Sequence, residues 1–292
     1  MPLEYLSEVK ELVRTKISLA IENKNLIEES MRYSALSNSK MIRAGLIFAS
    51  SELNEHLSRN STLTLASSVE LMHTYSLIHD DLPCMDDDNL RRGQPSNHVK
   101  YGEANAVLAG DALQALAYEI ICDDEDMKSE EKVHAIKLLS NSCGKTGMIH
   151  GQYLDILHEN NLENINQDIL EEIHNLKTGR LIECSVMLGQ IGGDSNKNTQ
   201  NVLKEFSKKI GLAFQITDDI LDVTETEDVL GKNNNSDIKN NKATYVEIVG
   251  LDNALKRASD LTNSALSMLI ESDLDNKDTL VSLARYIIKR SN

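Results

Sequence analysis

The sequence predicts an all-α protein: a single domain over residues 1–292, built of long, mostly antiparallel helices around a central cavity. Three observations predict this fold class. Apolar residues recur at the helical spacing of about 3.6 along most of the chain. Segments with the alternating pattern of β-strands are missing between the turn signals. Aromatic residues make up 4% of the chain and tryptophan is absent, which is poor material for a β-sandwich or barrel.

The first predicted helix covers residues 3–23, where apolar side chains share one face. The second covers residues 62–82, and we expect it to be buried because it is apolar over much of its surface. The pattern then repeats, which predicts further helices over 104–121, 131–149, 168–191, 200–222, 251–270 and 277–289. Polar breaks separate the helices at 123–131, 158–167, 192–200 and 225–242. None of these breaks resembles a domain linker.

The charge balance excludes some classes of function. The chain has 30 Lys and Arg against 46 Asp and Glu, a net charge of −16, which argues against binding to nucleic acids or anionic membranes. No run of about 18 apolar residues is present, so we expect no membrane span. The N-terminus has no apolar signal core. The four cysteines form no CxxC pair, and they fit a reducing, cytoplasmic setting best.

An acidic run follows the second predicted helix. Residues 80–88 hold five carboxylates in nine positions. Pro83 disfavours helical geometry at Leu82, so the acids should lie at a helix C-terminus, where the helix dipole is already negative. Such a run suits a cation site. On its own, however, a solvated acidic loop is the commoner explanation.

A second acidic run, Asp218-Asp219-Ile220-Leu221-Asp222, closes another apolar helix. Asp218 and Asp222 share one face, whereas Asp219 is turned about 100° away, toward solvent or another partner. Two such helix ends can face each other across a cleft and hold Mg²⁺, which bridges carboxylates to substrate phosphates. Cationic residues that could bind a diphosphate lie beside or between the runs: Arg91, Arg92, Lys177, Lys232 and Lys242.

These motifs carry a resemblance to a known family. The stretch HTYSLIHDDLPCMDDDNLRRG, with DDILD downstream, resembles the trans-isoprenyl diphosphate synthases and is most similar to the bacterial farnesyl diphosphate synthases. GDAL at 110–113, GQYLD at 151–155 and KTG at 177–179 extend the resemblance along the chain. It implies an isoprenoid synthase fold and a prenyltransferase. Such an enzyme joins isopentenyl diphosphate head to tail with dimethylallyl and geranyl diphosphates, which yields farnesyl diphosphate.

The resemblance also implies a metal site and a site for the allylic diphosphate. Three Mg²⁺ ions would bind with the diphosphate, held by Asp80, Asp86 and Asp218 and supported by Asp81 and Asp222. They would neutralise the leaving group so that the C–O bond ionises. The residues implied to contact the allylic diphosphate are Arg91, Lys177, Thr178, Gln215, Lys232 and Lys242. Of these, Lys177, Thr178 and Gln215 are implied to be catalytic, because their oxygen dipoles face the cation.

Isopentenyl diphosphate is implied to bind without metal, at Lys40, Arg43, His73 and Arg92. The sequence departs from the family here. Residues 38–44 read Asn-Ser-Lys-Met-Ile-Arg-Ala, where the usual pattern is Gly-Gly-Lys-Arg-x-Arg-Pro. Asn tolerates left-handed geometry, so we expect Asn38 to keep part of the turn. The departure bears on the binding of isopentenyl diphosphate rather than on the reaction class. Family precedent implies a homodimer.

Product length points to Tyr75 and Ser76, which precede Asp80 by about one helical turn. A ring at Tyr75 can close the floor of a pocket for the tail, or it can be an ordinary core tyrosine. The residues alone leave both open, and the resemblance favours the floor and a fifteen-carbon product. The alternatives are a geranylgeranyl diphosphate synthase, a class I terpene cyclase and a non-catalytic subunit of a heteromeric synthase. The intact DDILD motif argues against the last two.

Overall fold

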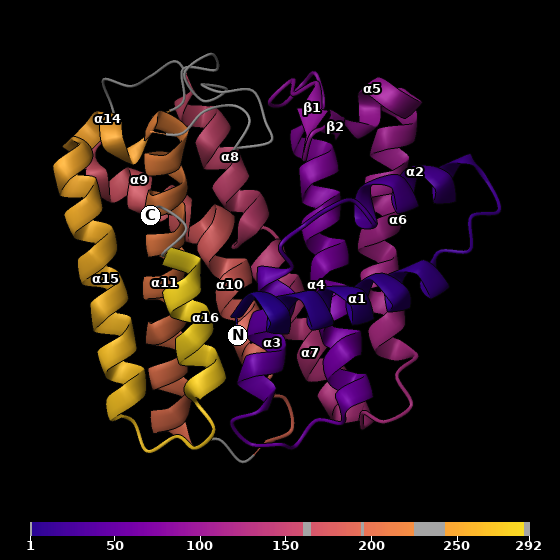
Figure 1. The fold of residues 1–292 in the computed structure, drawn as a ribbon. Coiled ribbons are helices and arrows are strands. Elements are labelled where there is room, and N and C mark those ends of the chain that lie inside the picture. Colours follow the sequence, from indigo (N-terminus) through magenta and orange to yellow (C-terminus); the bar gives the residue numbers. More distant parts are fainter. Residues whose placement is uncertain (1, 160–164, 194–195, 225–242, 289–292) are drawn as a thin grey trace.

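The computed structural model describes residues 2–159, 165–193, 196–224 and 243–288. The fold is all-α, as the sequence predicts. Within these ranges the strands are two-residue segments, β1 (Leu90–Arg91) and β2 (Gln94–Pro95), which pair antiparallel. The helices, in chain order, are α1 (Pro2–Ala20), α2 (Leu26–Ala35), α3 (Ile42–Ser51), α4 (Arg59–Asp80), α5 (Asn97–Tyr101), α6 (Glu103–Cys122), α7 (Ser129–Cys143), α8 (Met148–His158), α9 (Gln167–His174), the π-helical turn η2 (Asn175–Gly179), α10 (Arg180–Leu188), α11 (Lys197–Thr224), α14 (Tyr245–Val249), α15 (Leu251–Glu271) and α16 (Asp278–Ile288) (Figure 1).

Helix α4 is the buried centre of the bundle. Its N-cap, Ser58, accepts a hydrogen bond from the backbone N–H of Ser61, which satisfies one of the open donors of the first turn. Most of the following residues are buried against α1, α3, α6 and α7. The burial that the sequence predicts for 62–82 is therefore confirmed. The helix ends at Asp80, so an acid stands at the end of a largely buried element.

The apolar core forms three clusters that share helices. The first surrounds α4, the second lies between α3, α10, α11 and α16, and the third joins α11, α14 and α15. Helix α10 gives Leu181 to the first cluster and Ile182 to the second. Helix α11 gives Phe206 to the second and Ile216 to the third. The two long acid-bearing helices are thus held in one packed arrangement.

One expectation about the helices is wrong. The predicted helix over 131–149 is split into α7 and α8, because the chain folds back tightly between them. A Cβ at Gly147 would lie 2.0 Å from the carbonyl oxygen of Ser142, so this path admits only glycine. Helices α2 and α3, of ten residues each, were not expected. The segment over 168–191 is helical as predicted, with the π-helical turn η2 inside it.

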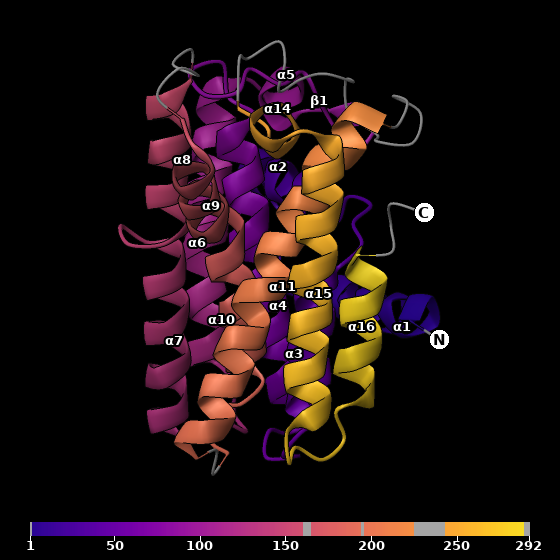
Figure 2. The same cartoon turned by 90° about the vertical axis from the view of Figure 1, so that its left-hand side faces the viewer.

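The acid-bearing ends of α4 and α11 lie at the same pole of the bundle, at the top of Figures 1 and 2, together with the β1–β2 hairpin. Helices α6 and α15, which pack against α4 and α11, begin at this pole as well. Among the described helices, none is long and apolar enough to cross a membrane.

Candidate active site

The chain turns sharply after Asp80 and returns to it. The backbone N–H of Asp86 donates to the carbonyl oxygen of Asp80 at 2.8 Å, and Met85 and Asp87 close on the carbonyl oxygen of Leu82. This turn returns the backbone of Asp86 to that of Asp80, although the two residues are six positions apart. Two carboxylate-bearing residues therefore stand at the end of α4, as the sequence predicts.

Asp81, next to this pair, is buried in the protein. It is 2% exposed and accepts a hydrogen bond from Arg91 Nε at 2.8 Å, while a second nitrogen of Arg91 bridges to Asp88 at 3.1 Å. Burial raises the pKa of Asp81 to about 6, although the neighbouring Arg91 guanidinium opposes the shift. Arg91 thus fastens the β1–β2 hairpin to the end of α4. Its guanidinium is engaged by these acids, and it does not line either large cavity described below.

The three acids near the end of α11 do not all lie on the same face of the helix. Asp218 and Asp222 are partly exposed near the end of the helix, whereas Asp219 is buried. Asp219 accepts hydrogen bonds from the backbone N–H of Tyr245 at 2.8 Å and from Gln215 Nε2 at 3.2 Å. Of the two alternatives that the sequence left open for Asp219, the structure gives the buried partner rather than solvent.

The π-helical turn η2 brings Lys177 and Thr178 to the same pole. Lys177 Nζ donates to Asp155 at 2.6 Å. Burial would lower the pKa of Lys177, but the negative charges of Asp155, Asp80 and Asp86 outweigh it and raise the pKa. The ammonium therefore stays charged, facing the first acidic run.

Thr178 Oγ1 donates to Gln215 Oε1 at 2.8 Å, which ties η2 to α11. Gln215 in turn donates to Asp219, so one chain of hydrogen bonds runs from the π-helical turn to the second acidic run. The three residues that the sequence resemblance marks as catalytic, Lys177, Thr178 and Gln215, are thus neighbours at one pole.

A cavity of about 630 Å³ opens below this pole. Asp80, Lys177 and Thr178 line its polar end, and Tyr75 and Ser76 line it one turn further down α4. Much of the remaining wall is apolar and comes from α6 and α8, including Val107, Met148, Ile149 and Ile156. A polar mouth above an apolar chamber suits a ligand with an anionic head and a hydrocarbon tail.

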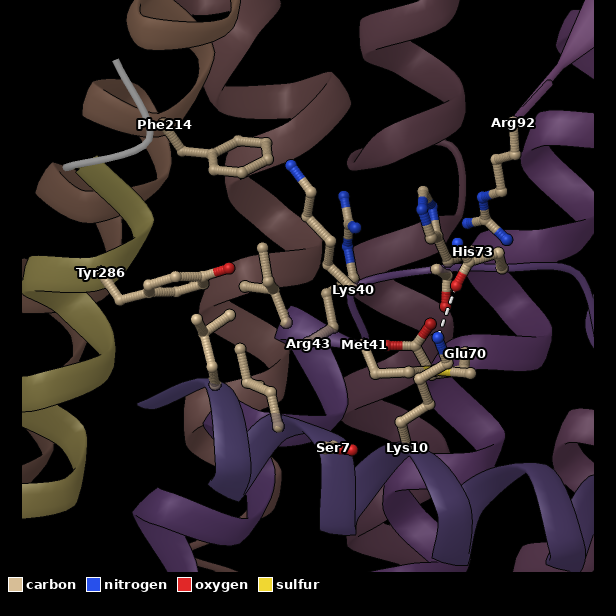
Figure 3. Close-up of a pocket in the computed structure, with 15 residues that line it drawn as sticks. Ser7, Lys10, Lys40, Met41, Arg43, Glu70, His73, Arg92, Phe214 and Tyr286 are labelled. Carbon is tan, nitrogen blue, oxygen red and sulfur yellow. Dashed lines mark hydrogen bonds between the residues drawn. The ribbon is translucent and has the colours of Figure 1, made fainter. Parts of the chain in front are cut away.

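A second cavity, of about 580 Å³, contains all four residues expected to bind isopentenyl diphosphate: Lys40, Arg43, His73 and Arg92. Figure 3 shows these side chains converging, with Phe214 and Tyr286 facing them from the opposite side. Arg43 and His73 line both cavities, so the two chambers meet at these side chains. Burial, and the positive charges of Arg43, Arg92 and Arg91, hold the pKa of His73 well below its usual range.

Sequence reasoning missed several residues of the second cavity. Glu70 is 4% exposed, accepts a hydrogen bond from the backbone N–H of Ala44 at 3.1 Å, and lies within electrostatic reach of Arg43 and Arg92. One signal could have found it, since Glu70 is the one acid in the apolar stretch before Asp80 and stands three residues before His73. Lys10, Phe214 and Tyr286 come from distant segments and carry no local signal.

The expectation for Asn38 is wrong. The left-handed residue of this turn is Met41, with φ 49°, which directly precedes α3. Its side chain is buried at 3% exposure. Two further expected residues, Lys232 and Lys242, lie outside the described residues. In the described part of the chain, no three His, Cys, Asp or Glu side chains already converge as a metal cage.

These features define a class of helical protein in which acidic helix ends stand at the mouth of an apolar cavity, beside a cavity lined with cations. The chain belongs to the family described as polyprenyl synthetase, whose model matches residues 24–286.

Individual relatives agree with this family. The farnesyl diphosphate synthase of Escherichia coli (strain K12) is 44% identical over 274 residues, which cover 91% of this chain and 89% of the relative. A chloroplastic geranylgeranyl pyrophosphate synthase of Catharanthus roseus is 42% identical over 91% of this chain and 74% of its own length.

Solved structures resemble the whole chain. An FPP/GFPP synthase from Zymomonas mobilis is 33% identical with a TM-score of 0.87, over 99% of this chain and all of the other. A geranyltransferase from Helicobacter pylori, complexed with magnesium and isoprenyl diphosphate, is 32% identical with a TM-score of 0.85, over 99% of this chain and 98% of its own.

Proposed function

We propose that this protein is a prenyltransferase that condenses isopentenyl diphosphate head to tail, first with dimethylallyl and then with geranyl diphosphate, and releases farnesyl diphosphate. One observation carries the proposal: an apolar cavity with an acidic mouth and a cationic cavity meet at Arg43 and His73. Two diphosphate esters bound in these cavities would bring their reacting carbons together where the cavities meet.

The donor set at the mouth fits Mg²⁺. The acidic side chains at the mouth are carboxylates, and Mg²⁺ prefers oxygen ligands. It also keeps water and phosphate oxygens in its coordination shell. It therefore does not need a preformed protein cage. Asp80, Asp86 and Asp218 would hold the metal, and we include in the proposal that three ions bind with the diphosphate. Bound there, Mg²⁺ would neutralise the charge of the leaving diphosphate.

Side chains of the protein bind the two diphosphates and stabilise the allylic cation. Lys177, held by Asp155 and kept charged by the acids around it, binds the departing diphosphate. Thr178 and Gln215, fixed to each other, direct oxygen dipoles toward the allylic cation. Lys40, Arg43 and Arg92 bind the second diphosphate by charge, and His73 by a neutral hydrogen bond. The apolar walls of the tail cavity keep water from the cation.

The test is to incubate the protein with Mg²⁺, dimethylallyl diphosphate and isopentenyl diphosphate, and to chromatograph the dephosphorylated products. We expect farnesol as the main product, and no product in EDTA. Asp80→Ala and Asp218→Ala should lower turnover by several orders of magnitude with the fold intact. The control is Asp123→Ala, an exposed acid at the far end of α6. A wild-type protein that forms no prenyl product, or an Asp80→Ala variant with normal turnover, contradicts the proposal.

A longer product is the second candidate, that of a geranylgeranyl diphosphate synthase. It is favoured by the relative from Catharanthus roseus, which is nearly as similar to this chain as the Escherichia coli protein. The same chromatogram distinguishes the two candidates, because geranylgeraniol elutes after farnesol.

The proposal includes a homodimer in the cytoplasm. Large apolar side chains are exposed on α6 and α8: Val107, Leu108, Ile149, Tyr153, Ile156 and Leu157. Exposed apolar side chains of this size are typical of protein interfaces when they form one patch. Three of these side chains, Ile149, Tyr153 and Ile156, also line the 630 Å³ cavity proposed to hold the hydrocarbon tail. A partner subunit packed on them would shield that wall of the cavity from solvent. The four free cysteines fit a reducing compartment. Sedimentation should give about twice the chain mass of 32.5 kDa, and a monomer would contradict the dimer.

A further inference from the structure

Helix α1 supplies a cation to the pocket of Lys40, Arg43, His73 and Arg92. Lys10 lines this cavity together with Leu3, Leu6 and Ser7 of the same helix. In Figure 3 its side chain rises from α1 toward the other cations, and the dashed line marks its hydrogen bond. Lys10 Nζ donates to Asn38 Oδ1 at 2.5 Å. The contact joins α1 to the segment that carries Lys40 and Met41.

Besides Lys10, the pocket holds the cations Lys40, Arg43 and Arg92, and part of their charge is offset. His73 is neutral, because burial and the neighbouring arginines lower its pKa. Glu70 is buried within electrostatic reach of both Arg43 and Arg92, and it partly offsets their charge. Met41 adds no charge and is buried. A diphosphate ester carries several negative charges, so a further cation at the edge of the pocket would strengthen its binding substantially.

We propose that Lys10 is a further binding residue for the diphosphate of isopentenyl diphosphate; this inference rests on the proposed function of the cavity. An ammonium group has three N–H donors. The amide of Asn38 accepts one of them and orients the side chain, which leaves the others for an anion. Asn38 and Lys10 act as a pair, since a glycine at position 38 would offer no side-chain acceptor to hold the lysine.

The chain offers a matched control on the same helix. Lys16 Nζ also donates to an asparagine amide, that of Asn60, at 3.4 Å. It does not line the cationic cavity. Lys10→Met and Lys16→Met therefore remove the same charge from the same helix and break the same kind of hydrogen bond. Effects of net charge or of α1 stability should be common to both variants.

The experiment measures steady-state kinetics with Mg²⁺ and, separately, calorimetric binding of isopentenyl diphosphate in EDTA, for the wild type and three variants. Lys10→Met should raise KM and Kd for isopentenyl diphosphate roughly tenfold, with KM for geranyl diphosphate unchanged. Lys16→Met should match the wild type, and Lys10→Arg should retain binding because it keeps the charge.

Two results overturn the inference. One is equal binding of isopentenyl diphosphate by Lys10→Met and Lys16→Met. The other is a loss in Lys10→Met that raises KM for both substrates alike, which would indicate a structural role. A wild-type protein without prenyltransferase activity would instead contradict the proposed function, so the two failures are distinguishable.

Discussion

His73 lies where the two cavities meet, and its protonation state decides what it can offer a diphosphate. Burial and three arginines lower its pKa well below the ordinary 6.5. The neutral imidazole then persists through the physiological range and donates one hydrogen bond without adding charge. Because the unfolded chain binds this proton more readily, His73 favours folding above pH 6.5 and loses that contribution as the pH falls toward its lowered pKa.

A neutral His73 predicts a simple pH dependence. His73→Gln keeps a neutral donor, so KM for isopentenyl diphosphate should depend on pH between 6 and 8 in the same way for the variant and the wild type. Any inflection near pH 6.5 that both share belongs to the substrate phosphates. Steady-state kinetics at several pH values checks this. An inflection present in the wild type and lost in His73→Gln would show that the imidazolium binds the diphosphate.

We expect product length to depend on Tyr75. It is 5% exposed, lines the tail cavity one turn below Asp80, and lies within electrostatic reach of Tyr118 and Cys143. Tyr75→Ala should open volume beneath the tail. Each added isoprene unit then buries more hydrocarbon, at about 0.8 kcal/mol per CH₂, and the product should lengthen to twenty carbons or more.

Chromatography of the dephosphorylated products measures the length. Phe in place of Tyr75 is the control, since it keeps the ring and should keep the fifteen-carbon product. An active Tyr75→Ala enzyme that still releases farnesyl diphosphate alone would place the floor elsewhere. Val107 would be the next candidate because it lines the same cavity, whereas Leu113 is buried in the core and Leu108 does not line the cavity.

At the residue scale, the sequence reveals functional groups that cluster along the chain. The acids at 80–88 were recognised because they stand in a local pattern, and His73 and Arg43 because the resemblance to a known family implies their role. Glu70 and Lys10 were not, since a single charge on an amphipathic or apolar helix is more often an ordinary surface or core feature. Their importance depends on which other helices face them, and no local pattern encodes that.

At the scale of elements, the close packing of α8 against η2 holds the backbone of Lys177 in position. A Cβ at Gly151 would lie 2.3 Å from the backbone nitrogen of Lys177, and backbone cannot move aside as a side chain can. Gly151→Ala should displace η2 and lower kcat, roughly a hundredfold, because a shift of about 1 Å at a catalytic group is enough. The control is Gly45→Ala, whose Cβ would first meet the flexible side chain of Leu6.

Steady-state kinetics and thermal melts of both glycine variants test this. We expect Gly45→Ala to retain kcat even if its melting temperature falls. If Gly151→Ala also retained kcat, the close packing of α8 on η2 would have no part in placing Lys177.

The turn between α6 and α7 depends on one buried acid. Asp124 accepts hydrogen bonds from Ser61 at 2.9 Å, Thr64 at 2.6 Å and the backbone N–H of Met127 at 2.9 Å. Burial opposes its ionisation, but these donors prevail and lower its pKa below the ordinary 3.8. In Asp124→Asn, an amide NH₂ group would face these donors and leave some of them without an acceptor. The substitution should therefore lower the free energy of unfolding by about 1–3 kcal/mol.

The sign of the pH effect follows from the lowered pKa. The stabilisation by Asp124 is complete above pH 3.8 and is lost as the pH falls through the lower folded pKa. Urea unfolding of wild type and Asp124→Asn should therefore differ by the same free energy at pH 5 and pH 8. A difference that changed markedly between these pH values would contradict the assignment.

Helix prediction succeeded where burial is one-sided or complete, as in α1, α4 and α11. It failed where the apolar period runs through a tight turn, between α7 and α8. Gly144 and Gly147 mark that turn, but isolated glycines are also tolerated within helices. The short helices α2 and α3 lie beside the departure at residues 38–44, and they gain their stability from packing rather than from their own length.

At the scale of the whole molecule, the cavities arise from elements that are far apart in sequence. The cationic cavity draws on α1, α3, α4, α11 and α16, besides the turn that precedes α3 and the β1–β2 hairpin. The sequence predicted an all-α fold with a central cavity, and the all-α fold is confirmed. It could not give two cavities with a shared wall, because that depends on how the helices pack. That residues 1–292 form one domain stays a prediction, which the shared helices of the three core clusters support.

The central claim is that one cavity binds its diphosphate through metal and the other through side-chain cations. The most direct measurement is calorimetric titration of the protein with isopentenyl diphosphate and, separately, with an unreactive thiolo analogue of geranyl diphosphate, each with Mg²⁺ and with EDTA. We predict that EDTA abolishes binding of the geranyl analogue and leaves that of isopentenyl diphosphate nearly unchanged, because Lys40, Arg43 and Arg92 are present without metal. Equal losses for both ligands, or binding of the geranyl analogue that survives EDTA, would contradict the account.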